Sequence, residues 1–160
     1  MGDNPTSDKK FFDQLILSAA RQSAYRKDAA QGRTGKAHNA MCGDVVEIGF
    51  TGSLHQELHH AGEGCILSQA FAAVACKEFV GLDKSAIELR VKQLSDFLAG
   101  GDSKNLPAEL AASGFAAASS VVDFTTRHPC IMLFAKSFED AWRKQWNESL
   151  TDQQLSLIHI

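Results

Sequence analysis

Apolar side chains near the start of the chain recur at helical spacing. They occupy positions 11, 12, 15, 16, 19 and 20, which predicts a helix from Phe11 to about Ala30. Residues 1–10 are mostly polar, so we expect this segment to be disordered. Residues 32–39 contain two glycines, His38 and Asn39, and are predicted to form a loop after the helix.

The hydrophobic pattern then changes to one that is typical of strands. Residues 44–50 (DVVEIGF) are rich in β-branched residues and predict a strand, and the sequence Thr-Gly-Ser at 51–53 predicts a turn. Residues 54–60 can pair back as a second, antiparallel strand, which the glycines at 62 and 64 would end. On such a strand His55, Glu57 and His59 would share one face, which we expect to face solvent.

The second half of the chain has a helical pattern for most of its length. The predicted helices run from Ser68 to Gly81, from Asp83 to Gly100, in part over 107–124, and from Ile131 to about Trp146, with a loop at 125–129. There is no internal repeat and no interior linker, so residues 11–150 are predicted to form one domain. The tail, residues 151–160, ends in LSLIHI, which has the sequence of a translated sequencing adapter and is set apart as an expected artefact.

Composition and charge narrow the class of protein. The chain has 160 residues, of which 44% are hydrophobic, and a net charge of -3, which argues against binding nucleic acid by bulk charge. No apolar run reaches the ~18 residues of a membrane helix, and the polar start lacks the apolar core of a signal peptide. We therefore expect a cytoplasmic protein without a membrane partner.

Four cysteines are the main candidates for chemistry. Without an export signal, reduced thiols are favoured over disulfides. Cys42, Cys65 and Cys130 lie at predicted joints between elements, and Asp44 follows two residues after the first of them. Three thiolates and a carboxylate would complete a tetrahedral site for a metal that accepts soft ligands, such as zinc, Cu(I) or iron–sulfur. By spacing alone, buried structural cysteines remain the favoured interpretation, because there is no CxxC pair.

Short motifs around these cysteines give a further indication. The sequences Cys-Gly-Asp at 42–44, Gly-Glu-Gly-Cys at 62–65, a serine at 68 and Arg-x-x-Cys at 127–130 occur in this order. Together they resemble the U-type iron–sulfur scaffolds, which are the IscU, SufU and NifU N-terminal proteins, over about residues 11–146. The resemblance implies an α+β fold in which an antiparallel sheet of about three strands packs against helices. It also implies a zinc or iron–sulfur cluster site formed by Cys42, Asp44, Cys65 and Cys130.

The surroundings of Cys130 narrow the resemblance to one branch. Pro129 precedes this cysteine, where IscU-type scaffolds carry a histidine, and the pattern V-x-x-F-x-x-R-x-x-C-x-x-L from Val121 to Leu133 is similar to that of SufU. This implies an assembly scaffold or sulfur carrier, rather than an enzyme, although a sulfurtransferase role is compatible with it. Its implied partners are a PLP-dependent, SufS-like cysteine desulfurase and downstream iron–sulfur assembly or acceptor proteins. Cys42 is the implied sulfur acceptor and Arg127 a basic residue near the site.

One segment departs from the family pattern, and several other residues are expected to have no role in the metal site. The family's H-Y-x-x-P segment is not recognisable in residues 23–31, and Cys76 is expected to be a packed core thiol. His38 and His128 are expected to be solvated loop residues. Trp142 and Trp146 are expected to form the core and the surface of the last helix, respectively.

Three other functions are weighed against the scaffold. A zinc hydrolase would use His55, His59 and His60, but Glu57 is not adjacent to His55, as H-E-x-x-H requires. A thiol redox enzyme would use Cys42 or Cys65 and would need a resolving cysteine within reach. A structural zinc module that only mediates protein contacts is the main alternative.

Overall fold

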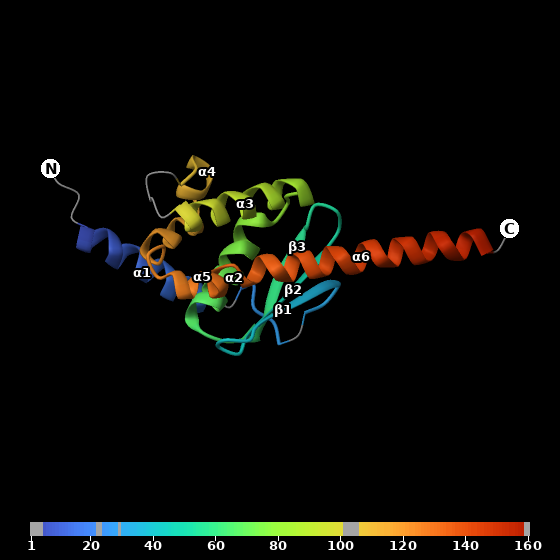
Figure 1. The fold of residues 1–160 in the computed structure, drawn as a ribbon, viewed down its shortest axis with the longest axis horizontal. Helices are drawn as coiled ribbons and strands as arrows, with labels where there is room; N and C mark the ends of the chain where they lie inside the picture. Colours follow the sequence, from blue (N-terminus) through green and yellow to red (C-terminus); the bar gives the residue numbers. More distant parts are fainter. Residues whose placement is uncertain (1–4, 22–23, 29, 101–105, 159–160) are drawn as a thin grey trace.

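The protein is built on a small antiparallel sheet, as predicted (Figure 1). The computed structural model describes residues 5–21, 24–28, 30–100 and 106–158. Its three strands are β1 (Arg33–Asn39), β2 (Asp44–Thr51) and β3 (Glu57–Glu63), in the spatial order β1-β2-β3. The register pairs Asn39 with Asp44 at one end of the first hairpin and Val45 with Glu63 at the same end of the second. The β1–β2 connection and the end of β3, which leads into the following helix, therefore lie at the same end of the sheet.

Helices make up most of the remaining structure. In chain order they are α1 (Pro5–Arg21), α2 (Ile66–Phe79), α3 (Lys84–Gly100), α4 (Ala108–Ala111), the 3-10 turns η2 (Gly114–Ser120) and η3 (Thr125–Arg127), α5 (His128–Ile131) and α6 (Leu133–Ile158). The partly helical stretch predicted over 107–124 is confirmed by α4 and η2. The loop predicted at 125–129 consists instead of η3 and the start of α5, which place Cys130 on a short helix.

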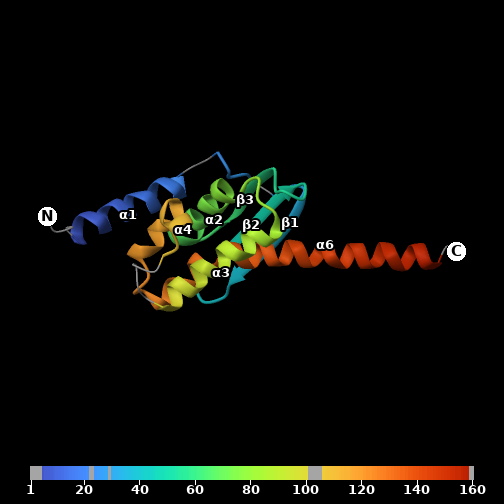
Figure 2. The same ribbon diagram turned by 90° about the horizontal axis from the view of Figure 1, so that it is seen from above.

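The core lies between one face of the sheet and two helices. Val46, Ile48 and Phe50 alternate along β2 and are fully buried, because α6 packs on β1 and β2 while α2 packs on β2 and β3. Phe79 on α2 has ring contacts with Phe134 and Phe138 on α6, with centroids 6.0 Å apart in both cases. In turn, α1 lies along α2, as Figure 2 shows from above. This α+β arrangement leaves one end of the sheet, at the β1–β2 connection, beside α5.

The loop prediction for residues 32–39 is wrong, because these residues form β1. Gly35 and Ala37 face α6 and are buried, while their neighbours are polar and more exposed. A Cβ atom on Gly35 would overlap the carbonyl oxygen of Ser137 and lie 2.5 Å from the backbone nitrogen of Ala141. The strand therefore uses its smallest residues where it touches the helix, which removes the hydrophobic alternation that identifies a strand in sequence.

The first predicted helix also differs from the structure, since α1 spans Pro5–Arg21 and does not reach Ala30. Residues 25–27 instead run beside β3, where the Lys27 N–H donates to the His60 carbonyl at 2.9 Å and the His60 N–H donates to the Tyr25 carbonyl at 2.7 Å. The Arg26 guanidinium donates to the Gly62 carbonyl at 3.0 Å. This segment covers the outer edge of β3.

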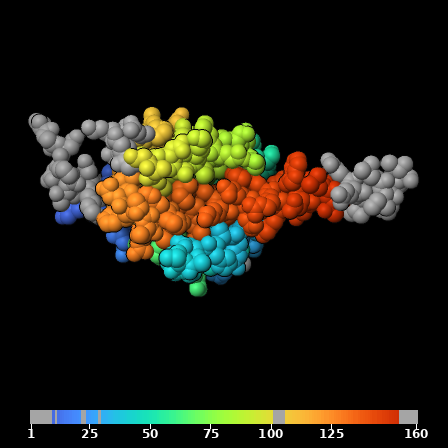
Figure 3. All heavy atoms as spheres, in the orientation of Figure 1, coloured from blue at the N-terminus to red at the C-terminus, as the bar shows by residue number. Residues whose placement is uncertain are grey.

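The last helix is longer than the predicted end at about Trp146. It continues to Ile158 and projects beyond the sheet, with its first half lying between α3 and the β1–β2 hairpin on the face seen in Figure 3. Residues 1–4 of the predicted disordered segment and 159–160 of the predicted tail lie outside the described residues. Among the helices described, none combines the length and the apolar character that crossing a membrane requires.

Candidate metal centre

The predicted ligand residues meet at the end of the sheet beside α5. Cys42 lies in the turn between β1 and β2, and Asp44 is the first residue of β2. Cys65 follows β3 and caps the start of α2, while Cys130 lies on α5. Four separate elements therefore deliver one candidate ligand each, although the cysteines are 23 and 65 residues apart along the chain.

Short distances connect the four side chains. The Sγ atoms of Cys42 and Cys130 are 3.7 Å apart, and the Cys65 Sγ lies 3.1 Å from Asp44 Oδ2. One ligand atom each from Cys42, Asp44 and Cys130 lies within 4.8 Å of the other two. Within the described ranges, this is the one group of three or more ligand-type side chains that is close enough to hold a metal ion.

Burial and hydrogen bonding set the protonation of the group. Asp44 is 1% exposed, and burial alone would raise its pKa, but hydrogen bonds from the Cys42 thiol, the Cys65 backbone N–H and the thiols of Cys65 and Cys130 hold that pKa below its ordinary value. Burial, together with the neighbouring Cys42 and Cys65, raises the pKa of the Cys130 thiol to about 12. The centre thus combines a carboxylate with a thiol that needs a nearby cation to ionise.

A glycine allows the β3–α2 joint to approach the carboxylate. A Cβ atom on Gly64 would lie 2.5 Å from Asp44 Oδ1 and 2.8 Å from Ser68 Oγ. Because glycine lacks a Cβ atom, the backbone can come close enough for the Cys65 N–H to donate to Asp44 Oδ1 at 2.8 Å. The Gly-Glu-Gly-Cys motif therefore has a steric role in placing Cys65 against Asp44.

Arg127 lines the same cavity as Cys65 but is not part of the sulfur–carboxylate group. It is exposed on η3 and lines a cavity of about 450 Å³ together with Cys65, Ile66 and Val121. Cys76, by contrast, is fully buried in the core on α2, as predicted, and burial raises its pKa far above the ordinary range. The structure therefore separates three clustered cysteines from one packed cysteine.

Asn39 is a residue near the centre that the sequence did not single out. Its side-chain Nδ2 donates to the Cys130 Sγ at 3.5 Å from the last position of β1. The signal available in the sequence was its position three residues before Cys42, but the predicted loop concealed the strand end that orients it.

Comparison with known proteins defines the fold. No protein-family model and no curated protein matches the chain. Two solved structures align over most of it: a nitrogen-fixing NifU-like protein (N-terminal) from Brucella abortus and a putative iron–sulfur cluster assembly scaffold protein for the SUF system from Fervidobacterium islandicum AW-1. The first is 20% identical with a TM-score of 0.68, covering 86% of this chain and 94% of its own. The second is 21% identical with a TM-score of 0.63, covering 79% and 92%, respectively.

The chain has the IscU/NifU fold. At these identities the likeness concerns the backbone, so the chemistry rests on the residues present in this chain. Cys42, Asp44 and Cys130 are close enough to hold one metal ion with a preference for soft ligands, and Cys65 places a third thiol 3.1 Å from the Asp44 carboxylate, just outside that group.

The three histidines of the rival zinc site do not form a site on this IscU/NifU fold. His55 and His59 are buried, so the prediction that the face shared by His55, Glu57 and His59 is exposed to solvent is wrong for both of these histidines. His59 Nε2 accepts from the Gln31 backbone N–H at 2.8 Å, because the segment before β1 covers that face of the sheet. His60 points to the opposite face, in register with Ile48.

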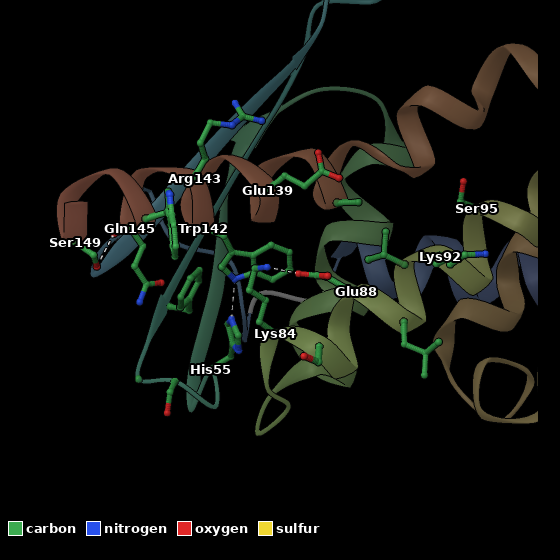
Figure 4. A pocket seen from close by; sticks show the side chains of 18 of the residues that line it. His55, Lys84, Glu88, Lys92, Ser95, Glu139, Trp142, Arg143, Gln145 and Ser149 are labelled. Atoms are coloured by element: carbon green, nitrogen blue, oxygen red, sulfur yellow. Dashed lines mark hydrogen bonds and ion pairs between the residues drawn. The ribbon is translucent and has the colours of Figure 1, made fainter. Parts of the chain in front are cut away.

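His55 is engaged elsewhere, at the floor of a groove of about 1210 Å³ between α3 and α6 (Figure 4). Its Nε2 accepts from the Trp142 indole N–H at 3.2 Å, so its Nδ1–H donates to the Leu82 carbonyl at 2.7 Å. The ammonium of Lys84 lies 5.3 Å from the centre of the Trp142 ring. Both ring nitrogens of His55 are therefore occupied by structural hydrogen bonds.

Of the two histidines expected to be solvated loop residues, only one is exposed. His38 is exposed, whereas His128 is half-buried and makes a 2.7 Å hydrogen bond with the Val122 carbonyl, so the expectation of a solvated loop residue is wrong for His128. Trp142 lies in the core and Trp146 on the surface, as predicted.

Proposed function

We propose that this protein is a SufU-type iron–sulfur cluster assembly protein, which takes persulfide sulfur from a cysteine desulfurase. The observation that supports this most strongly is the meeting of Cys42, Asp44, Cys65 and Cys130, from four separate elements, at one end of the sheet. Two solved structures that share its fold are a NifU-like protein and a putative scaffold protein for the SUF system.

Cys42, Asp44, Cys65 and Cys130 would hold either a zinc ion or an iron–sulfur cluster. A bound cation would supply the charge that keeps buried thiols ionised, which the raised pKa of Cys130 otherwise prevents. Three thiolates and a carboxylate carry four negative charges, so a divalent ion leaves a net charge of about -2. Arg127, which lines the same cavity as Cys65, would offset part of that charge.

Cys42 is the acceptor that its position favours. It is exposed in a turn, whereas Cys65 is half-buried and Cys130 is 2% exposed. In the proposed step, the Cys42 thiolate attacks the terminal sulfur of the desulfurase persulfide, and the sulfur–sulfur bond of that persulfide breaks. The desulfurase cysteine leaves as a thiolate and Cys42 becomes the persulfide, so no external oxidant or reductant is consumed.

The surface around the centre suits a protein partner. Met41 is 94% exposed next to Cys42, and Ile66 and Phe124 are also exposed large apolar side chains near Cys65 and Arg127. A desulfurase could cover this rim while its persulfide reaches Cys42, and downstream iron–sulfur acceptors would use the same approach. We accordingly propose a non-enzymatic carrier or scaffold that works in the cytoplasm, where thiols are kept reduced.

Desulfurase activation tests the proposal. A PLP-dependent cysteine desulfurase of the SufS type is supplied with cysteine, and sulfide release is measured with and without this protein after reduction. We expect several-fold stimulation, and trapping before reduction should show one added sulfur atom on Cys42 by mass spectrometry. Cys42→Ala should abolish both effects, whereas the control Cys76→Ala should retain them. Metal binding without stimulation or sulfur transfer would favour the structural zinc module instead.

A further inference from the structure

Asn39 connects two parts of the centre that are far apart in the chain. It is the last residue of β1 and pairs with Asp44, the first residue of β2. Its backbone carbonyl accepts from the N–H of Cys42 at 3.3 Å and of Gly43 at 2.8 Å, which closes the turn that carries Cys42. Its side chain reaches Cys130, which is 91 residues further along the chain.

The hydrogen bonds of the side chain fix its orientation. Asn39 Oδ1 accepts from the Met41 backbone N–H at 3.2 Å, and that N–H can only donate. The oxygen must therefore face the turn, which directs the amide NH₂ group to the Cys130 Sγ at 3.5 Å. One amide thus caps the Cys42 turn with its oxygen and donates to the sulfur of a second candidate ligand with its nitrogen.

We propose that Asn39 is a positioning residue of the metal centre, which ties the Cys42 turn to Cys130 and donates an N–H···S hydrogen bond to the ionised sulfur. This inference rests on the proposed function, because it assumes that Cys130 binds as a thiolate. A donor to an anionic sulfur makes a stronger hydrogen bond than one to a neutral thiol. Groups that hydrogen-bond to metal ligands change metal affinity about 10–100-fold when they are removed.

Two substitutions separate the two halves of this role. Asn39→Asp keeps an oxygen that can accept from the Met41 N–H, but replaces the donor to Cys130 with a second oxygen. Asn39→Ala removes both interactions. His38→Ala is the matched control, because His38 is the exposed neighbour on β1 and points away from the buried face.

Zinc affinity, measured by competition with a chromophoric chelator, gives the first measure. We expect about 10–100-fold weaker binding in both Asn39 variants and no change in His38→Ala. The thiolate-to-cobalt charge-transfer band of the Co²⁺-loaded protein gives the second, and it should move to lower energy in Asn39→Asp because the sulfur loses a hydrogen bond. An Asn39→Asp variant with the affinity and band of the wild type would overturn the donor role.

The exchange rate of the Met41 amide with solvent separates failure of this inference from failure of the proposed function. It is measured by NMR on the full chain as purified, and it should rise in Asn39→Ala but not in Asn39→Asp. If the wild type binds neither zinc nor cobalt, the proposed function fails, and so does the role of Asn39 as a donor to a metal-bound thiolate. The exchange rate would then test only whether Asn39 holds the Cys42 turn in place. Unchanged exchange in Asn39→Ala would overturn that positioning as well.

Discussion

At the level of single side chains, burial favours the uncharged form of three histidines. Burial lowers the pKa of His55 and of His59, and together with the charges of Arg26 and His59 it lowers the pKa of His60 to about 4. His60 is 2% exposed, and neither of its ring nitrogens has a hydrogen-bond partner in the described part of the chain. The His60 side chain therefore contributes to the core by filling space and not by hydrogen bonding.

We predict that acid weakens the fold through His60. Its folded pKa lies below the unfolded value of about 6.5, so the unfolded chain binds more protons at acid pH and the free energy of unfolding rises with pH. The contribution is complete above about pH 6.5 and is lost as the pH falls towards 4, amounting to on the order of 3 kcal/mol. Urea unfolding between about pH 7 and pH 4.5 measures this loss.

His60→Leu is the variant that isolates the effect. The leucine fills a similar volume without a titrating or unpaired group, so the free energy of unfolding should vary less with pH and exceed that of the wild type at about pH 5. His38→Ala, at an exposed position, should retain the pH dependence of the wild type. An equally steep dependence in His60→Leu would show that the acid sensitivity arises elsewhere.

At the level of elements, prediction succeeded where the pattern was local. The β-branched residues of β2 predict a strand, and the spacing of apolar residues predicts helices at α2 and α3. All three elements lie within a few residues of their predicted positions. The β1 strand was missed because Gly35 and Ala37 occupy its core-facing positions. The burial of His59 depends on Gln31 and its neighbours covering the second face of the sheet, which is a tertiary contact that no local pattern contains.

Gly35→Ala tests the close packing of β1 on α6. The added methyl group would overlap the Ser137 carbonyl oxygen and crowd Ala141, so the strand or the helix must move. We expect the free energy of unfolding to fall by about 1–3 kcal/mol, measured by urea denaturation. Gly100→Ala is the control, since its added Cβ would meet no atom of another element within 4 Å in the described part of the chain, and it should cause no loss. Equal stability of Gly35→Ala and the wild type would mean that β1 is not tightly packed on α6.

At the level of the whole molecule, the candidate centre depends on topology. The spacing of Cys42, Cys65 and Cys130 did not by itself favour a metal site, and the ligand set came from a family resemblance. The structure brings these residues together because the β1–β2 connection, the end of β3 that leads into α2, and α5 meet at the same end of the sheet. The contribution of Asn39 could not be predicted, since it depends on a contact across 91 residues.

Metal content of the purified protein is the most direct test of the central claim that this centre binds a metal. Elemental analysis should find about one zinc ion per chain, or iron with sulfide if a cluster is present. Cys42→Ala, Cys65→Ala and Cys130→Ala should each lose that metal, whereas Cys76→Ala should retain it despite some loss of stability, because Cys76 lies in the core. A wild-type protein that folds normally, contains no metal as purified and takes up none when zinc is supplied would contradict the account.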